Sequence, residues 1–197
     1  LFRSPEDEQV LISVAKDLRG KLSLIIVPHE PTPSHLRHIE DKLQARGLHS
    51  VRYSQADRWD SQREILLIDQ TGILAELYQK GRFAFVGGSF RKTVHSVMEP
   101  LAAGAITYVG PLHTNNREAL FFQKCGLSPA QGHQGAATQT AVIVCENAPQ
   151  MRDSLTQLLA QSNHQQDIWK TEIKEEVRKL SGQSEKVLAW VLEKAKT

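Results

Sequence analysis

Short apolar runs alternate with amphipathic stretches along most of this chain. Five runs have the length and composition of buried strands, and they lie at 22–27, 65–68, 83–86, 106–109 and 141–144. A shorter strand candidate lies at 50–53. Continuous apolar runs are typical of parallel strands that are covered on both faces. Because parallel strands need crossover helices between them, the alternation predicts an α/β fold with a Rossmann-like, doubly wound parallel sheet of about six strands.

Helix start and stop signals lie between these runs. Ser4 and Pro5 are a cap and a first helical residue, and Thr32 and Pro33 repeat that pattern. A helix that begins at His95 or Ser96 is expected to end before a glycine at 104. We therefore expect helices at 5–18, 33–46, 95–103 and 148–162.

The last third of the chain has a different character. Helical patterns at 167–180 and 184–194 are separated by Gly182, and their charges fit a solvated helix face. Trp169 and Trp190 are expected to dock these helices on the body of the protein. The predicted division is a Rossmann-like domain at 1–165 with C-terminal helices at 166–197 packed on it.

Composition excludes several classes of protein. The chain has 197 residues, 40% hydrophobic residues and a formal net charge of +2, which describes a soluble globular protein and not a nucleic-acid-binding one. Cys125 and Cys145 have neither metal-ligand spacing nor a secreted pattern, so a reducing cytoplasm is expected. The sequence has no signal peptide and no apolar run of the ~20 residues that a bilayer requires.

The strongest candidate for function is the segment that follows the run at 83–86. Gly87 and Gly88 let a ligand approach the backbone, and Ser89 and Ser96 offer hydroxyl donors. Glu99 falls in the first turn of the following helix, where a carboxylate could accept both hydroxyls of a ribose, while the helix start suits a phosphate. This arrangement predicts a nucleotide-sugar site.

Two more loops follow predicted strands and are expected at the same sheet edge. Pro28, His29 and Glu30 come after the first run, and 69–72, which ends in Gly72, comes after the third. Ligands of open α/β sheets bind at the carboxyl ends of the strands. Each loop taken alone also fits a plain turn, and Glu99 alone also fits a favourable partner of the helix dipole.

Several other chemistries lack their motifs. The chain has no G-x-G-x-x-G after its first strand, no P-loop and no G-x-S-x-G elbow, which argues against dinucleotide binding, P-loop hydrolysis and the α/β-hydrolase reaction. The histidines at 29, 35 and 38 gather loosely, but no carboxylate or cysteine completes a metal set. We expect no metal and no cofactor.

At this point the residues support a resemblance to a known family. The segments VGGSF at 86–90, HSVMEPLAAG at 95–104 and GP at 110–111 with Asn115, Arg117 and Glu118 resemble the donor-binding half of 3-deoxy-D-manno-octulosonic acid (Kdo) transferases. The segments SPEDE at 4–8, PHEP at 28–31, DQTGIL at 69–74 and SEKVL at 184–188 resemble other parts of the same half. The resemblance therefore covers almost the whole chain.

The resemblance implies a fold and an activity. These enzymes have the GT-B fold of two Rossmann-like domains, and they are metal-independent, inverting transferases that move Kdo from CMP-Kdo to the lipid A precursor in lipopolysaccharide biosynthesis. This chain would be the C-terminal half, without the acceptor domain, its general base and its membrane-contacting surface. The fragment alone is then expected to be soluble and inactive, and the full protein to work at the cytoplasmic face of the bacterial inner membrane.

The resemblance also implies roles for individual residues. Glu99 would hold the ribose, with Met98 beside it, and Gly87, Gly88, Ser89 and Ser96 would meet the phosphate or the Kdo carboxylate. Pro28, His29 and Gly72 would flank the base or the phosphate. Further anion contacts are expected from residues with charged or amide side chains, namely Arg91, Lys92, Asn115 and Arg117.

Two positions depart from the family pattern, which leaves other functions open. Many relatives have an arginine where His29 stands and an asparagine where Ser96 stands, and a neutral histidine is the poorer phosphate ligand. Arg91, Lys92 or Arg117 could supply the missing charge. The alternatives are the donor half of a UDP-sugar GT-B glycosyltransferase and a non-catalytic Rossmann-like nucleotide-binding module.

Overall fold

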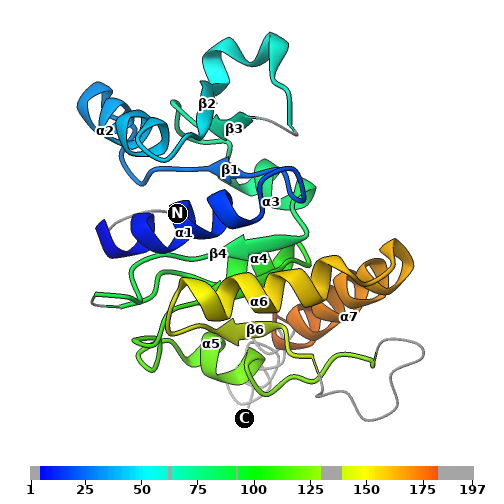
Figure 1. Ribbon diagram of the computed structural model, residues 1–197. Coiled ribbons are helices and arrows are strands. Elements are labelled where there is room, and N and C mark those ends of the chain that lie inside the picture. Colours follow the sequence, from blue (N-terminus) through cyan, green and yellow to red (C-terminus); the bar gives the residue numbers. More distant parts are fainter. Residues whose placement is uncertain (1–4, 62–63, 92, 130–138, 182–197) are drawn as a thin grey trace, which may run out of the picture.

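A computed structural model of the chain describes residues 5–61, 64–91, 93–129 and 139–181, and Figure 1 shows its alternating strands and helices. The strands are β1 (Ile25–Ile26), β2 (His49–Arg52), β3 (Glu64–Leu67), β4 (Phe83–Phe85), β5 (Ile106–Val109) and β6 (Val142–Val144). The helices are α1 (Pro5–Asp17), α2 (Pro33–Gln44), α3 (Leu74–Lys80), α4 (Met98–Ala102), α5 (Arg117–Phe122), α6 (Ala148–Leu159) and α7 (Asn163–Ser181), with a 3₁₀ helix η1 (Tyr53–Arg58). All six predicted strands are present.

The strands form two parallel sheets. The first has the order β1-β3-β2, with Ile25 opposite Leu66, and the second has the order β4-β5-β6, with Phe83 opposite Ile106. Every pair within a sheet is parallel, so each connection is a crossover, as the alternating pattern predicts. The predicted α/β, Rossmann-like class is confirmed.

The single six-stranded sheet expected from the sequence is instead divided in two. No hydrogen-bonded pairing joins β1 to β4 within the described residues. An apolar cavity of about 640 Å³ is lined by Ile25 of β1, by Val27 just after it, and by Phe83 and Phe85 of β4. β1 has only two residues and pairs with β3, so it contributes little backbone to a second ladder.

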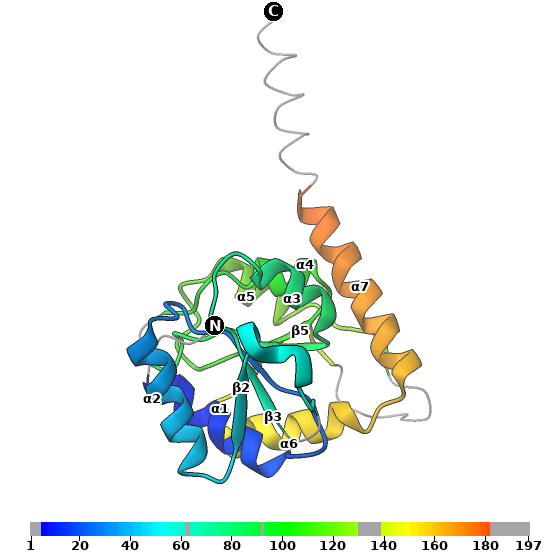
Figure 2. The same cartoon turned by 90° about the horizontal axis from the view of Figure 1, so that it is seen from above.

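Helices cover both faces of the sheets, as expected for a doubly wound fold. Helices α1 and α6 pack against each other on one face, and α3, α4 and α7 lie on the other (Figure 2). The fully buried side chains between them include Tyr108 of β5, whose hydroxyl group is 2.9 Å from that of Ser154 in α6. Burial raises the pKa of the Tyr108 phenol, which keeps this hydroxyl neutral at physiological pH.

Helix α2 begins at the predicted residue, whereas α4 is shorter than predicted. The Thr32 hydroxyl oxygen accepts a hydrogen bond from the His35 backbone N–H at the start of α2. Helix α4 begins only at Met98, so Ser96 precedes it, although Gly104 follows its end with a φ of +82° as predicted. Val94 and Val97, in the stretch before Met98, are both buried in the core.

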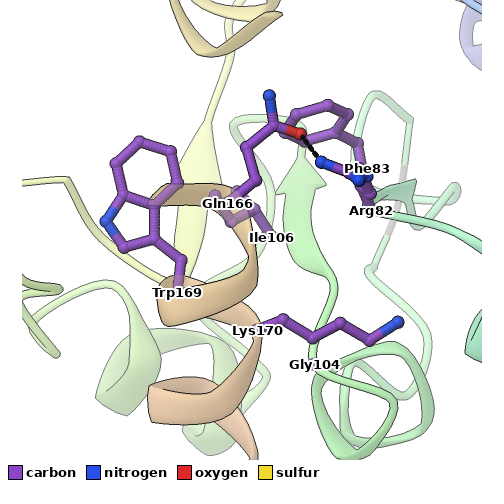
Figure 3. Close-up of a pocket in the computed structure, with 7 residues that line it drawn as sticks. All are labelled: Arg82, Phe83, Gly104, Ile106, Gln166, Trp169 and Lys170. Carbon is purple, nitrogen blue, oxygen red and sulfur yellow. Dashed lines mark hydrogen bonds between the residues drawn. The ribbon is translucent and has the colours of Figure 1, made fainter. Parts of the chain in front are cut away.

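The C-terminal part packs on the body through α7, which begins at Asn163 and extends past the body at its far end (Figure 2). Trp169 is 3% exposed, and its indole N–H donates to the Ser128 carbonyl at 2.8 Å, which confirms its predicted docking role. Figure 3 shows α7 beside the first residues of β4 and β5, with Lys170 close to Gly104. The predicted helix at 184–194 and Trp190 lie outside the described residues.

Candidate functional site

The turn after β4 can be made only with glycine at position 88. Gly88 has a φ of +101°, a conformation that residues with a Cβ rarely adopt. A Cβ added there would lie 2.2 Å from the Thr93 carbonyl oxygen. Gly87 and Gly88 are both buried, and the Arg91 N–H closes the turn on the Gly88 carbonyl oxygen at 3.2 Å. The two glycines therefore let two backbone segments pack closely here, and the approach of a ligand to them stays a prediction.

The turn is tied to the first helix by a residue that the sequence interpretation missed. The Gly88 N–H donates to the carboxylate of Asp7, in the first turn of α1, at 2.7 Å, and Asp7 is fully buried. The sequence contains no local sign of this contact, because Asp7 and Gly88 are 81 positions apart. A buried carboxylate here holds the turn and directs an anionic ligand away from the Gly88 N–H.

Ser89 joins this turn to the loop that follows β5. Its hydroxyl oxygen accepts the Gly110 N–H at 2.6 Å, and its carbonyl oxygen accepts the Leu112 N–H at 2.8 Å. Gly110 is required for the contact, because an added Cβ would lie 2.7 Å from the Phe90 ring. Ser89 is 0% exposed, so its hydroxyl has a structural role here, and contact with a ligand stays a prediction.

The loops after β1 and β4 meet through two histidines. The imidazole rings of His29 and His95 are stacked, with centroids 5.9 Å apart and an angle of 16° between their planes. His29 is exposed, His95 is half-buried, and Pro28 is buried behind them. The carboxyl ends of β1 and β4 therefore lie at one edge of the molecule, as predicted.

His95 is held from two further directions. The Asn116 side-chain amide donates to the His95 carbonyl oxygen at 3.1 Å, while the Asn116 side-chain oxygen accepts the Ala119 N–H to cap α5. A Cβ on Gly88 would lie 3.4 Å from Cδ2 of His95, so this ring lies against the glycine turn. The sequence interpretation treated His95 only as the start of a helix.

The predicted ribose ligand lies nearby on α4. Glu99 is exposed in the first turn of this helix, Ser96 is exposed just before it, and Met98 is half-buried. Burial and the negative charge of Glu99 raise the pKa of the Tyr78 phenol, in α3, to about 12. The Glu99 carboxylate therefore lies close enough to Tyr78 for the two groups to interact electrostatically. Glu99 is therefore available to solvent on the same segment as His95.

The remaining predicted residues are mostly exposed side chains and loop positions. Gly72 is exposed with a φ of +91°, and Asp69 in the same loop accepts hydrogen bonds from the Ser54 N–H, at 3.1 Å, and from the Ser54 hydroxyl. The exposed side chains include Arg91, Asn115 and Arg117, while Lys92 lies outside the described residues.

The described residues contain neither a metal-ligand cluster nor a membrane-spanning helix. Within 5–61, 64–91, 93–129 and 139–181, no group of three histidine, cysteine or acidic side chains could hold a metal ion. In the same ranges, no helix has both the length and the apolar character that crossing a bilayer requires. None of the predicted ligand residues lines the large apolar cavity between β1 and β4, so the candidate site is the loop edge.

The fold and these loops define a Rossmann-like α/β domain with its candidate ligand residues at one sheet edge. No protein-family model matches the chain. Its relatives are named 3-deoxy-D-manno-octulosonic acid transferase: one from Rickettsia felis is 24% identical over 162 residues, one from Chlamydophila psittaci is 31% identical over 114, and one from Aquifex aeolicus is 29% identical over 124. These matches confirm the resemblance to the Kdo transferases.

The matches cover much of this chain but a small part of each relative. They span 81%, 54% and 60% of the chain, and 32%, 24% and 33% of the Rickettsia, Chlamydophila and Aquifex proteins respectively. A solved structure, the C-terminal CMP-Kdo binding domain of WaaA from Acinetobacter baumannii, has a TM-score of 0.67 and 23% identity, and covers 89% of this chain and 84% of that one. At 23% sequence identity, the similarity between the two structures shows the fold alone.

Proposed function

We propose that this chain is the donor-binding part of a glycosyltransferase that transfers Kdo from CMP-Kdo to the lipid A precursor. The observation that carries the proposal is the meeting of the loops after β1 and β4 at His29 and His95, with Glu99 exposed on the next helix. A carboxylate at this edge suits the two hydroxyls of a ribose. The similarity to named Kdo transferases and to a CMP-Kdo binding domain supports the choice of donor.

The chain's own residues fit one half of the reaction. In an inverting transfer, a general base removes the proton of the acceptor hydroxyl while the CMP phosphate leaves from the opposite face of the sugar. Glu99 would orient the nucleotide, and cationic groups at this edge would stabilise the negative charge that develops on the departing phosphate. The general base, the acceptor site and the contact with the cytoplasmic face of the inner membrane would come from another part of the full protein. The transfer would need no metal ion. This chain alone would not catalyse it.

Calorimetric titration of the chain with CMP, UMP and UDP tests the choice of nucleotide. We expect CMP to bind more tightly than either uridine nucleotide. A clear preference for UDP would instead indicate the donor half of a UDP-sugar enzyme. Absence of binding to all three nucleotides would contradict the proposal and leave a non-catalytic interaction module.

The ribose contact has a matched pair of variants. Glu99→Ala should weaken CMP binding by roughly 1–3 kcal/mol, as expected for a hydrogen bond to a charged group. Glu76 is likewise exposed in the first turn of a short helix, α3, so Glu76→Ala controls for the general loss of one acidic side chain. Equal effects of the two substitutions on CMP binding would show that Glu99 does not contact the ribose.

A further inference from the structure

The segment that leads to the predicted ribose ligand has an irregular backbone. Residues 93–97, between the glycine turn and α4, are neither helix nor strand. Val94 and Val97 anchor this segment in the core, with exposures of 6% and 0%. Backbone polar groups in such a segment need partners from elsewhere, because no helix or strand ladder supplies them. The place of Glu99 at the start of α4 therefore depends on contacts between this segment and other parts of the chain.

One of these contacts comes from Asn116, the residue that caps α5. Its side-chain nitrogen donates to the His95 carbonyl oxygen at 3.1 Å, and its side-chain oxygen accepts the Ala119 N–H at 2.8 Å. Asn116 is half-buried, so water competes less with both bonds than it would at an exposed position. A single amide group therefore joins the segment before α4 to the first turn of α5.

The loop between β5 and α5, which carries Asn116, is itself fixed. At its start, the Gly110 N–H donates to the hydroxyl oxygen of Ser89 at 2.6 Å. Near its end, the Asn116 N–H donates to the His113 carbonyl oxygen at 2.9 Å. His113 is buried, and its Nε2 lies 3.1 Å from the side-chain oxygen of Gln123. Asn116 therefore presents its side-chain amide to His95 from a loop that is held at both ends.

From these contacts we infer that Asn116 is a positioning residue of the nucleotide site, which holds residues 95–99 so that the Glu99 carboxylate faces the ribose. The inference rests on the proposed function and adds a residue to it. Capping of α5 uses only the side-chain oxygen of Asn116. The bond that the side-chain nitrogen donates to His95 is not needed for the cap, and it is the bond that acts on the nucleotide site.

Two substitutions separate the cap from the positioning bond. Asn116→Asp and Asn116→Thr both keep a side-chain oxygen that can cap α5, but neither has an amide N–H to donate to His95. We expect both variants to keep a urea midpoint close to that of the parent chain. Asn116→Thr should bind CMP roughly three- to tenfold more weakly in calorimetric titration, as expected for the loss of one hydrogen bond. Asn116→Asp should weaken the binding of cytidine by a similar factor, and cytidine is uncharged, so the added carboxylate does not repel it.

Asn147 provides the matched control for a change of cap residue. It caps α6, its side-chain oxygen accepts the Gln150 N–H at 3.0 Å, and this helix carries no predicted ligand residue. Asn147→Thr should therefore leave the affinity for CMP unchanged.

A double-mutant cycle tests whether Asn116 acts through Glu99. If it does, Asn116→Thr should weaken CMP binding in the parent chain but add little to the loss already caused by Glu99→Ala. Additive losses would show that Asn116 does not act through Glu99 and would overturn the positioning role.

The remaining outcomes separate this inference from the proposed function. If the parent chain binds CMP and Asn116→Thr binds it equally well, the positioning role is overturned and the nucleotide site stands. An equal loss of affinity in Asn147→Thr would also overturn the positioning role. Failure of the parent chain to bind CMP would overturn the proposed function and this inference together. Because two different substitutions keep the cap, the test stands even if one of these variants does not fold.

Discussion

Replacing Gly88 with alanine tests the construction of the candidate site. The substitution places a Cβ in a backbone with a φ of +101°, which costs a residue with a side chain about 1–2 kcal/mol. The added atom would lie 2.2 Å from the Thr93 carbonyl oxygen and 3.3 Å from its carbonyl carbon, so the clash is with backbone and not with a flexible side chain. Relief requires the turn to move.

That movement also removes the hydrogen bond from the Gly88 N–H to Asp7. Loss of a bond to a buried charged group costs about 1.5–3 kcal/mol. The two contributions together predict that Gly88→Ala lowers the free energy of unfolding by roughly 3–5 kcal/mol, a large fraction of the stability of a typical domain. Urea unfolding followed by circular dichroism measures this loss.

Gly47 is the matched control for the conformational part of the cost. It has a φ of +71°, and a Cβ built there has no atom within 4 Å. Gly47→Ala should therefore lose only about 1–2 kcal/mol. If both variants lose the same free energy of unfolding, the close approach at Gly88 and its bond to Asp7 do not hold the turn, and the reasoning is refuted.

Three further substitutions or measurements probe the surroundings. Ser89→Ala should cost about 1–3 kcal/mol in urea unfolding, because the buried Gly110 N–H loses its acceptor, and an unchanged midpoint would argue against that bond. Glu99→Gln should lower the pKa of Tyr78 from about 12, because burial and the Glu99 carboxylate together raise it. An unchanged pKa in a spectrophotometric titration would show that the two side chains do not interact. Cys145 is 3% exposed and burial raises its pKa to about 11, so it should resist a thiol reagent until urea unfolds the chain, and rapid labelling of the native protein would contradict its burial.

Most of the strands could be read from the sequence because they are short apolar runs covered by helices, whereas β2 (HSVR) has no buried residue and gave a weaker signal. Helices α3 and α5 carried no comparable signal. Helix α3 has no buried residue and no side-chain cap, and α5 has six residues, too few to establish an apolar period. The separation of β1 from β4 was also missed, since strand patterns predict burial and not which edges form hydrogen bonds.

Some features of the candidate site could likewise be predicted from the sequence, and others could not. The glycine turn after β4 could be predicted from the glycine pair itself. Glu99 lies in the first turn of α4 as predicted, although that helix begins later than the sequence indicates. The part played by Asp7 could not be predicted, because its partner lies 81 positions away and the tertiary fold alone brings them together. The stacking of His29 on His95 likewise depends on the juxtaposition of β1 and β4, which brings two separate loop residues together.

The most direct test of the account is to map CMP binding on the chain by nuclear magnetic resonance. Backbone amide shifts recorded during titration with CMP should change at His29, His95 and Glu99, which line the edge where β1 and β4 end. Amides at Gly104 and Trp169, which lie where α7 packs beside the start of β5 (Figure 3), should stay unchanged. Saturable changes confined to the α7 side, or no changes at all at concentrations that reach saturation for related nucleotide sites, would contradict a CMP-binding loop edge.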